Sequence, residues 1–427
     1  MKKTLPIFFL FFSSCFLFED EQNTNLTLSL HSAGVTTVNL NISPEDSLAQ
    51  FTFELTRDDS TVQTLSLQSD TLLKDTGLNP NTSYTYKGYW KNGTERIGES
   101  ETLTVTTMDT TSHNFTWEID TLGEYGSYLN DVWIVDENDI WVVGEIITDS
   151  GWYNLAKWDG LKWDLELVYA VGAIINSIQY FNENDIWVSC GGYPTYWDGS
   201  EWTLYRLHDM GIDAGYINAI WGTSSNNMYF VGRKGSIVHY NGNEFIKMES
   251  GTDVDLIDID GTIDGDYIFI TGYTNMFGVT ASVALEIAQN QINTLIYTDL
   301  REPDVDEFGR IWSSHIVDDT VYFATGGGVW KYNYFSKHST YLTNEEVKMG
   351  ERGYLSIGSN GSNDLLFFGS GMTYVHYNGM RWHKDEHFYP EYNFKSIRGD
   401  LKGDLAVMVG FQVENVFWKG IILRGHR

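Results

Sequence analysis

Acid–base and metal chemistry would need residues that this sequence does not bring together. Among the ten His we expect no metal-ligand spacing such as His-x-x-x-His, which zinc sites on helices use. Two neighbouring pairs, His208-Asp209 and Glu386-His387, have the residue types that general acid–base catalysis uses. Both pairs fall in segments that are expected to be loops, where such groups are usually solvated. We therefore predict no catalytic residue and no metal ligand.

A cluster of acids resembles a calcium-binding loop only superficially. Asp258-Ile259-Asp260-Gly261 is followed by Asp264 and Asp266. A calcium loop of the EF-hand type has an acid and then a Gly at its fifth and sixth positions, and this segment lacks that pair. The run Gly326-Gly327-Gly328 leads to no predicted helix, so it is not a phosphate-binding loop. The sequence also lacks a nucleophile elbow, and we expect no cofactor.

Charge and composition exclude several classes of protein. Among 427 residues, 58 are acids and 27 are Lys or Arg, which gives a formal net charge of −31. A nucleic-acid binder needs clustered basic residues, and an anionic membrane surface would repel this chain. The same charge favours a partner whose surface is basic or neutral. With 15% aromatic residues, 41 Gly and only 6 Pro, the chain is expected to be rich in short strands and tight turns.

The N-terminus predicts export. Two Lys precede an apolar run over residues 5–18, so residues 1–18 are expected to be a signal peptide. Phe12-Ser13-Ser14-Cys15 resembles a bacterial lipobox, in which the Cys is acylated; the alternative is removal of Cys15 with the signal peptide. The acids at 19–21 resemble the surface-export signal of Bacteroidota lipoproteins. We expect an outer-membrane or cell-surface lipoprotein whose only membrane contact is its lipid anchor, or else a periplasmic or secreted protein.

Residues 25–108 are expected to form a small β-sandwich. Apolar residues alternate with polar ones, as at Leu26, Leu28 and Leu30, and this period of two is typical of strands. The segment Leu78-Asn79-Pro80-Asn81-Thr82-Ser83-Tyr84 resembles the corner of fibronectin type III domains. The resemblance implies that the Tyr hydroxyl bonds back to the turn backbone. It also implies a spacer role.

Residues 115–427 contain a repeat of about 44 residues. Its first half is a strand, an Asn-Asp turn and a second strand, as in Asn138-Asp139-Ile140-Trp141-Val142, with copies between residues 138 and 410. Its second half is an Asp-Gly or Asn-Gly pair flanked by aromatics, as in Trp158-Asp159-Gly160-Leu161-Lys162-Trp163. Such a pair predicts a hairpin in which both central residues have positive φ. Two hairpins per repeat make a four-stranded antiparallel sheet, the unit of a β-propeller.

The two ends of this repeat region complete one another. The chain stops at Arg427, before the last repeat has its fourth strand, while the strand Phe115-Thr116-Trp117-Glu118-Ile119 precedes the first repeat. We therefore predict an all-β fold: a seven-bladed β-propeller closed by an N-terminal strand. The repeats resemble those of exported bacterial propellers, and residues 319–329 also resemble the ligand-sensing propellers of two-component regulators. Neither resemblance implies a reaction.

Binding residues are expected on one face of this propeller. Turns inside the two hairpins are short and uniform and share one face, whereas the other connections vary in length and share the opposite face, where binding concentrates. The predicted binding residues are Trp152, Tyr153, Tyr193, Arg233, Tyr273, Phe277, His387 and Tyr389. The same connections carry many acids, so this face is expected to be acidic.

The function that these observations favour is that of an exported, monomeric binding module that recognises a protein or glycan through its variable loops. One alternative is a carbohydrate-active hydrolase or lyase with paired carboxylates at the propeller mouth. Two carboxylates facing a central pocket, one of them with a raised pKa, would favour the enzyme. A second alternative is a structural envelope protein without a ligand.

Overall fold

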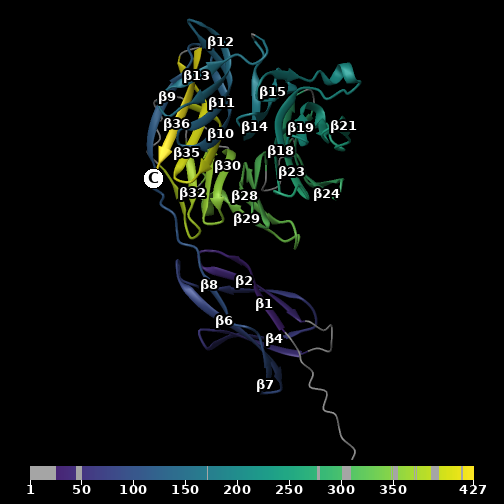
Figure 1. The fold of residues 1–427 in the computed structure, drawn as a ribbon, viewed down its shortest axis with the longest axis vertical. Helices are drawn as coiled ribbons and strands as arrows, with labels where there is room; N and C mark the ends of the chain where they lie inside the picture. Colours follow the sequence, from purple (N-terminus) through teal and green to yellow (C-terminus); the bar gives the residue numbers. More distant parts are fainter. Residues whose placement is uncertain are drawn as a thin grey trace, which may run out of the picture. The chain divides into compact units, whose positions relative to one another are not determined.

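A computed structural model divides the chain into two units, Met1–Met108 and Asp109–Arg427 (Figure 1). It describes residues 26–44, 51–170, 172–276, 279–300, 309–347, 349, 354–369, 371, 373–385, 394–414 and 417–427. The predicted signal peptide and Cys15 lie outside these ranges. Within the ranges, no helix has the length and apolar character needed to cross a membrane.

The first unit consists of two antiparallel sheets. One has the order β1-β2-β5 and comprises β1 (Leu26–Ala33), β2 (Thr37–Pro44) and β5 (Thr71–Thr76). The other has the order β4-β3-β6-β7, with β8 pairing β6, and comprises β3 (Phe51–Arg57), β4 (Ser60–Leu67), β6 (Ser83–Asn92), β7 (Glu95–Glu99) and β8 (Leu103–Thr106). Buried side chains from both sheets, such as Leu40, Phe53 and Trp90, form one core.

The corner contact expected in this unit is present. The backbone N–H of Asn79 donates a hydrogen bond to the Tyr84 hydroxyl at 2.9 Å. Two residues further on, the buried Tyr86 donates its hydroxyl to Asp75 at 2.8 Å. These bonds fix the turn against the start of β6, because each satisfies a polar group that the turn would otherwise leave unpaired.

The described residues of the second unit form seven four-stranded antiparallel sheets. Six of them use consecutive strands: β10 (Tyr128–Asp136), β11 (Asp139–Thr148), β12 (Gly151–Trp158) and β13 (Trp163–Glu166); β14 (Ile175–Asn182), β15 (Asp185–Cys190), β16 (Tyr193–Trp197) and β17 (Trp202–Leu204); β18 (Ile217–Ser224), β19 (Asn227–Gly232), β20 (Ile237–Tyr240) and β21 (Phe245–Met248); β22 (Leu256–Gly261), β23 (Tyr267–Met276), β24 (Val279–Ala288) and β25 (Gln291–Asp299); β26 (Ile311–Val317), β27 (Thr320–Thr325), β28 (Gly328–Asn333) and β29 (Ser339–Thr343); β30 (Tyr354–Gly361), β31 (Asp364–Gly369), β32 (Thr373–Tyr377) and β33 (Trp382–Lys384).

The remaining sheet takes its strands from both ends of the unit. Its order is β34-β35-β36-β9, with β34 (Phe394–Lys402), β35 (Leu405–Glu414), β36 (Phe417–His426) and β9 (Thr116–Leu122). The first strand of each sheet contacts the first strand of the next sheet, and β34 contacts β10. Among the described residues, three short helices lie in the connections: η1 (Leu207–Met210), η2 (Arg233–Gly235) and α1 (Asn344–Val347).

The Asp-Gly hairpin turns form as expected but with a different backbone geometry. Among the two central residues of the first such turn, only Gly160 has positive φ, at 91°. The Asp159 carboxylate instead accepts hydrogen bonds from the backbone N–H groups of Leu161 and Lys162, both at 2.8 Å. The expectation of positive φ at both positions was wrong. The Asp159 carboxylate accepts the N–H groups of the turn, so the turn forms without a positive φ at Asp159.

The two turns of a sheet also pack against each other. A Cβ atom added at Gly160 would lie 2.6 Å from the side-chain oxygen of Asn138, which belongs to the Asn-Asp turn of the same sheet. The second sheet repeats this contact between Gly199 and Asn184, at 2.7 Å. Such approaches exclude any larger residue than Gly, so the two halves of the sequence repeat are sterically coupled.

Strand β9 pairs with β36 in continuous antiparallel register, from Thr116 opposite His426 to Leu122 opposite Gly420. Arg424 of β36 adds ion pairs to two side chains of β9, Asp120 at 2.9 Å and Glu118 at 3.0 Å.

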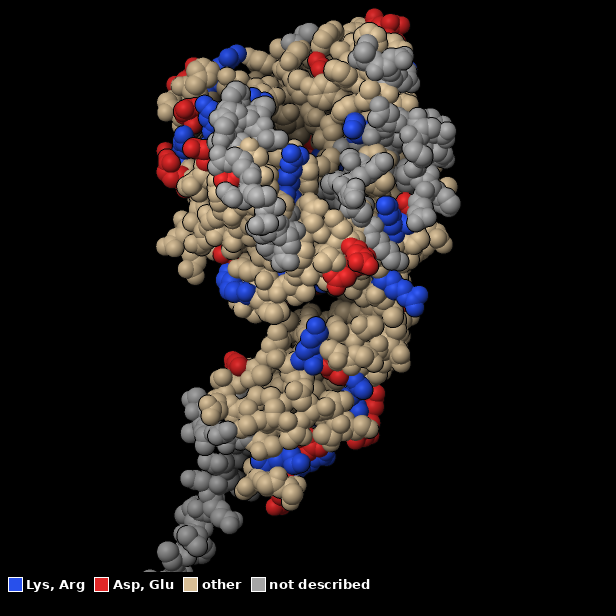
Figure 2. Space-filling model, turned by 180° about the vertical axis from the view of Figure 1, so that it is seen from behind, with Lys and Arg blue, Asp and Glu red and all other residues tan. Residues whose placement is uncertain are grey.

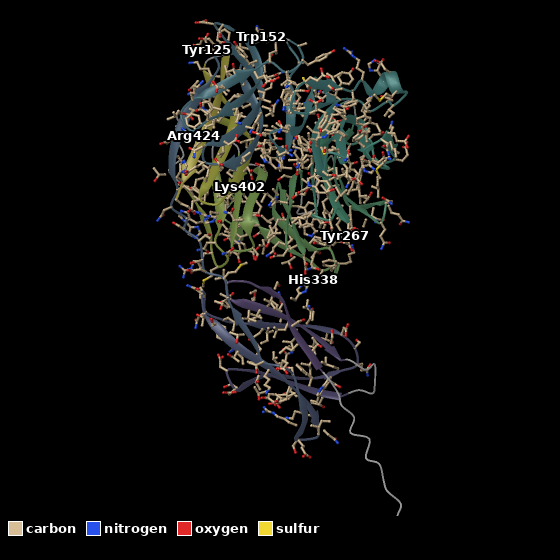
Figure 3. The ribbon with its side chains drawn as sticks, viewed as in Figure 1. Tyr125, Trp152, Tyr267, His338, Lys402 and Arg424 are labelled. Atoms are coloured by element: carbon tan, nitrogen blue, oxygen red, sulfur yellow. The ribbon has the colours of Figure 1, made fainter. Side chains whose placement is uncertain are left out.

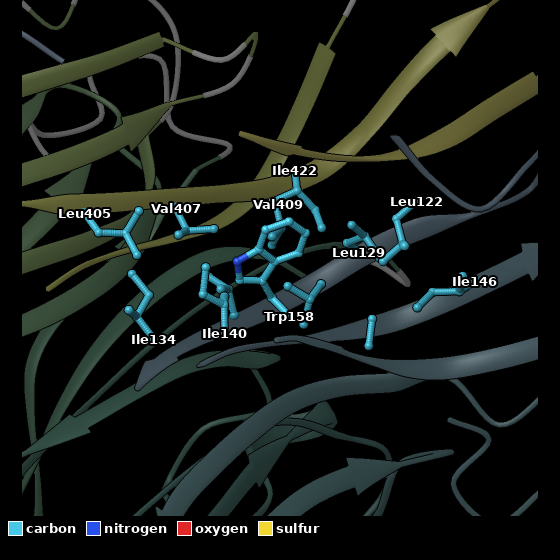
Figure 4. Packing of buried hydrophobic residues seen from close by; sticks show 13 residues of the cluster. Leu122, Leu129, Ile134, Ile140, Ile146, Trp158, Leu405, Val407, Val409 and Ile422 are labelled. Carbon is cyan, nitrogen blue, oxygen red and sulfur yellow. The ribbon is translucent and has the colours of Figure 1, made fainter. Parts of the chain in front are cut away.

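Apolar packing connects this seventh sheet to the first (Figure 4). Leu122 of β9 and Ile422 of β36 belong to the same buried cluster as Ile140 and Trp158 of the first sheet. The Arg424 guanidinium lies 4.2 Å from the centre of the Trp158 ring. The strand from the start of the unit therefore contributes to both the hydrogen bonding and the core of the last sheet.

We predict that deleting residues 1–120 destabilises the second unit much more than deleting residues 1–110. The longer deletion removes most of the β9 ladder and exposes the edge of β36, whereas the shorter one leaves β9 whole. A loss of about 4 kcal/mol should lower the melting temperature by about 6 °C in calorimetry. Equal melting temperatures for the two truncations would show that β9 is dispensable.

Candidate functional site

The connections at the two ends of these sheets have different structures. Because neighbouring strands are antiparallel, the turns inside the first and second hairpins of every sheet lie at one end. We call this end the tight-turn face. The connections between second and third strands and those between successive sheets lie at the other end, the variable-loop face.

Three connections of the variable-loop face are extended β-hairpins. Their outermost residue pairs are Thr148–Gly151, Met276–Val279 and Glu414–Phe417. The predicted binding residues Trp152, Tyr153 and Tyr273 therefore lie in strands, where we expected irregular loops. The backbone ladder of each hairpin holds these side chains in fixed positions.

The predicted binding residues differ in exposure. Trp152 projects from the end of its hairpin with 42% of its surface exposed (Figure 3). Tyr153 beside it is half-buried against the core of the first sheet. Tyr193 is half-buried, and its ring centre lies 6.0 Å from that of His208. The side chains of three other predicted residues lie outside the described residues: Phe277, His387 and Tyr389.

Three arginine–tyrosine pairs lie on the variable-loop face. In each pair the guanidinium carbon lies over a Tyr ring, at these distances from the ring centre: 6.0 Å for Arg206–Tyr169, 5.0 Å for Arg233–Tyr216 and 5.3 Å for Arg310–Tyr273. Arg206 also donates to the Tyr169 hydroxyl at 2.6 Å. Sequence analysis identified Arg233 and Tyr273 but not their partners, because the partners come from other connections of the fold.

A pocket of about 340 Å³ lies beside the second of these pairs. We call it the loop pocket; its walls include Tyr193, Leu207, His208, Ile212 and Asp213. Helix η1 buries Leu207 and leaves His208 exposed, where the imidazole lies 2.8 Å from the Asp209 carboxylate. The pocket thus combines apolar walls with a polar rim.

A second cavity, of about 430 Å³, is lined by the innermost strands of the sheets. We call it the channel cavity; a hollow is visible on this unit in Figure 2. Its charged lining residues are Asp131, Asp258, Asp260, His315, Arg398, Asp400 and Lys402. The acids at positions 258 and 260 lie on the inner strand β22.

The channel carboxylates bond from one sheet to the next. Asp131 accepts hydrogen bonds from the Ser177 hydroxyl at 2.9 Å and from the Ile178 N–H at 3.0 Å. Asp258 accepts one from the Ser314 N–H at 2.7 Å, and Asp260 one from the Ile316 N–H at 2.9 Å. These carboxylates therefore fasten neighbouring inner strands to one another.

Two of these acids also bind cations. Asp258 forms an ion pair with Arg398, and Asp260 lies 3.1 Å from His315. Burial opposes the charged imidazole, but the hydrogen bond and charge of Asp260 outweigh it and raise the pKa of His315. Burial raises the pKa of Asp131 and of Asp400.

Sequence analysis missed a histidine cluster on the sixth sheet. The Nδ1 atoms of His113 and His376 are 2.7 Å apart, and the His376 Nε2 lies 2.8 Å from the buried Asp364, which also pairs with Arg427. His383 stacks 4.9 Å from His113 and is four residues before His387, a spacing that we overlooked. His383 lies in strand β33, and no group of described His, Cys, Asp and Glu has metal-binding geometry. The cluster ties both ends of the unit to the sixth sheet.

Comparison with known proteins supports the fold. No protein-family model and no curated protein matches the sequence. A solved structure of YCF48 bound to D1 peptide is similar over 74% of this chain and 97% of its own, with a TM-score of 0.55 and 15% identity. The extracellular domain of the one-component system BT4673 from B. thetaiotaomicron gives a TM-score of 0.47 at 10% identity, over 71% of this chain and 39% of its own. The similarity to YCF48 confirms the predicted all-β propeller fold.

We predict that Asp258→Ala lowers the free energy of unfolding by about 3 kcal/mol, because it removes the carboxylate that forms an ion pair with the largely buried Arg398 guanidinium. The double variant Asp258→Ala with Arg398→Met should lose less, because no unpaired charge remains. Urea denaturation measures both values. If the double variant is at least as destabilised as the single one, the ion pair is not the source of the loss.

Proposed function

We propose that this protein is an exported binding module that recognises a protein or glycan through the variable-loop face of its propeller. The observation that carries the proposal is an aromatic patch on this face, which consists of Tyr125, Trp152, Phe417 and Trp418. These side chains are 53%, 42%, 54% and 41% exposed, respectively. Exposed aromatic side chains that cluster on a rigid framework are typical of binding surfaces.

The patch belongs to one continuous piece of structure. The connection from β9 to β10 lies between two of the extended hairpins: the Gly126 N–H donates to the Trp418 carbonyl at 2.7 Å, and the Glu124 N–H donates to the Ile147 carbonyl at 2.5 Å. Ile147 is paired with Trp152 across the first hairpin. The rings of Tyr125 and Phe417 are 5.1 Å apart. A partner can therefore meet these aromatic side chains as one surface.

The peptide complex of YCF48 supports protein recognition, since a propeller of similar fold binds a peptide. The lipobox-like segment ending at Cys15 supports anchoring of the protein outside the cytoplasm, and the fibronectin-like corner of the first unit supports a spacer between anchor and propeller. We propose a monomer, because these parts need no second copy to present the binding face.

One observation favours an enzyme as the second candidate. Asp131 and Asp400 both line the channel cavity, and burial raises the pKa of each. A structural role of Asp131 argues against the enzyme. Its Oδ1 accepts a hydrogen bond from the Val132 N–H, and its Oδ2 accepts from the Ser177 hydroxyl and the Ile178 N–H. Glycan hydrolysis that Asp131→Asn abolishes without lowering the melting temperature would establish the enzyme.

We predict that the double variant Trp152→Ala with Tyr153→Ala loses the partner that wild-type protein captures from extracts of its source organism. Aromatic anchors typically contribute about 2 kcal/mol or more when they are interface hot spots. The matched control is Leu161→Ala with Met380→Ala, which removes exposed apolar side chains of 88% and 45% exposure from the tight-turn face. Quantitative pull-down compares the three proteins. Capture that depends on the control residues rather than on Trp152 and Tyr153 would place binding on the tight-turn face.

Anchoring through Cys15 has its own test. We predict that Cys15→Ala moves the protein from the membrane fraction to the soluble fraction, because a lipid chain can no longer be attached. Cell fractionation and metabolic labelling with a fatty acid measure the change. Full membrane retention of the variant would refute lipidation at this residue.

A further inference from the structure

The three arginine–tyrosine pairs share an unusual electrostatic property. In the part of the chain that the structure describes, Arg206, Arg233 and Arg310 form no ion pair with a carboxylate. The chain has 58 acids and only 27 Lys and Arg, so carboxylates are abundant. Other described arginines of this unit use them: Arg398, Arg424 and Arg427 all form ion pairs. Among the described residues, the three guanidiniums of the variable-loop face therefore have no carboxylate partner, and Arg206 donates one N–H to the Tyr169 hydroxyl.

Stacking prepares these guanidiniums for recognition. A guanidinium that lies over an aromatic ring uses its flat face, and its N–H edges stay available for a carboxylate. The ring also restricts the side chain, so less conformational entropy is lost when a ligand binds. Arg310 lies beside two rings that contact each other, 5.3 Å from the centre of Tyr273 and 5.7 Å from that of Trp312. The indole N–H of Trp312 is buried without a hydrogen-bond acceptor, which adds a donor beside this arginine.

Two of the acids near Arg206 and Arg233 have other partners, although Asp209 also attracts Arg206. Four acids precede Arg310 in the sequence and lie outside the described residues: Glu302, Asp304, Asp306 and Glu307. Asp209 pairs with His208 at 2.8 Å, and Asp255 accepts a hydrogen bond from the Lys234 N–H at 2.8 Å. Asp213, on the rim of the loop pocket, is the remaining acid close to Arg206 and Arg233 in the chain. Charges further away are screened over about 8 Å at physiological ionic strength. The net charge of the chain therefore does not decide what binds at these positions.

The loop pocket indicates what the rest of the ligand is. Gly215 lines this pocket, and a Cβ atom added there would lie 3.3 Å from the backbone oxygen of Arg233. The pocket walls nearby include Leu207 and Ile212. Such walls suit an aliphatic or aromatic side chain, whereas a sugar ring would need more hydrogen-bonding groups than they offer. An apolar pocket beside the backbone of Arg233, on the face that carries the three arginines, fits a peptide better than a glycan.

We infer that the variable-loop face binds an acidic polypeptide segment through Arg206, Arg233 and Arg310, with an apolar side chain of that segment in the loop pocket. The inference rests on the proposed binding function and names the chemistry of the partner. It replaces the basic or neutral partner that the net charge of −31 suggests. In this inference the stacked guanidiniums, and not the net charge of the chain, determine the chemistry of the partner.

Fluorescently labelled poly-L-glutamate is a suitable probe, because a protein of net charge −31 does not attract a polyanion non-specifically. We expect anisotropy titrations with the full chain to show saturable binding. The variant Arg206→Gln, Arg233→Gln, Arg310→Gln should weaken it by about tenfold or more, the loss typical of removing charge-assisted hydrogen bonds. Lysine at the same three positions should restore only part of the affinity, because a lysine cannot bind a carboxylate through two parallel N–H groups. The control is Arg381→Gln, an exposed arginine of the tight-turn face without an ion pair or ring, and it should bind as wild type.

The inference is overturned if poly-L-glutamate does not bind, or if the triple variant and the control bind it equally. Polygalacturonate bound in preference to poly-L-glutamate, with the same arginine dependence, would assign an anionic glycan and overturn the peptide. The variants must have the same melting temperature as the wild type. A loss of binding then results from the removed arginine side chains and not from unfolding. The pull-down with Trp152→Ala and Tyr153→Ala separates the two proposals: a partner lost from that variant but retained by the triple arginine variant preserves the binding function and refutes the acidic segment.

Discussion

The pairing of β9 with β36 is the interaction on which the second unit depends. It joins strands that are separated by nearly the whole unit in sequence, and it covers the edge that β36 would otherwise expose to other chains. The contact between β34 and β10, and the shared core around Trp158, both presuppose that the last sheet is complete. Arg427 and His113 reinforce the same junction by binding the sixth sheet through Asp364 and His376.

Most of the polar groups at the centre of this unit take part in contacts that hold its sheets together. Asp131, Asp258 and Asp260 each accept a hydrogen bond from the backbone of the next sheet, so these acids bind strands. The groups that are left for a ligand lie on the variable-loop face, where aromatic rings are exposed on extended hairpins and guanidiniums lie in connections between strands. The groups that hold the sheets together and the groups that are available to a ligand thus lie in different parts of the same unit.

The repeat could be predicted from sequence because its turns are local. Asn138 and Gly160 determine the chain path within a few residues, and their copies recur at regular intervals. The site was only partly predictable, because Arg233 contacts Tyr216, and Arg310 contacts Tyr273, across separate connections of the fold. Trp152 and Tyr273 were placed in loops, since alternation alone does not reveal how far a hairpin extends beyond the sheet. His113 and His376 are 263 residues apart in sequence and gave no local signal.

The packing of Asn138 against Gly160 has a consequence for how this scaffold tolerates change. Because a Cβ atom at Gly160 would collide with the Asn138 side chain, the two turns of the sheet act as a single steric unit. An inserted residue in either turn would displace both hairpins and shift the register of the sheet. The hairpin from β11 to β12 has no such neighbour at its tip, so residues added between Thr148 and Gly151 would lengthen only the projection. The molecule is therefore a one-sided display framework: foreign peptides can be grafted on the variable-loop face while the opposite face keeps the sheets in register.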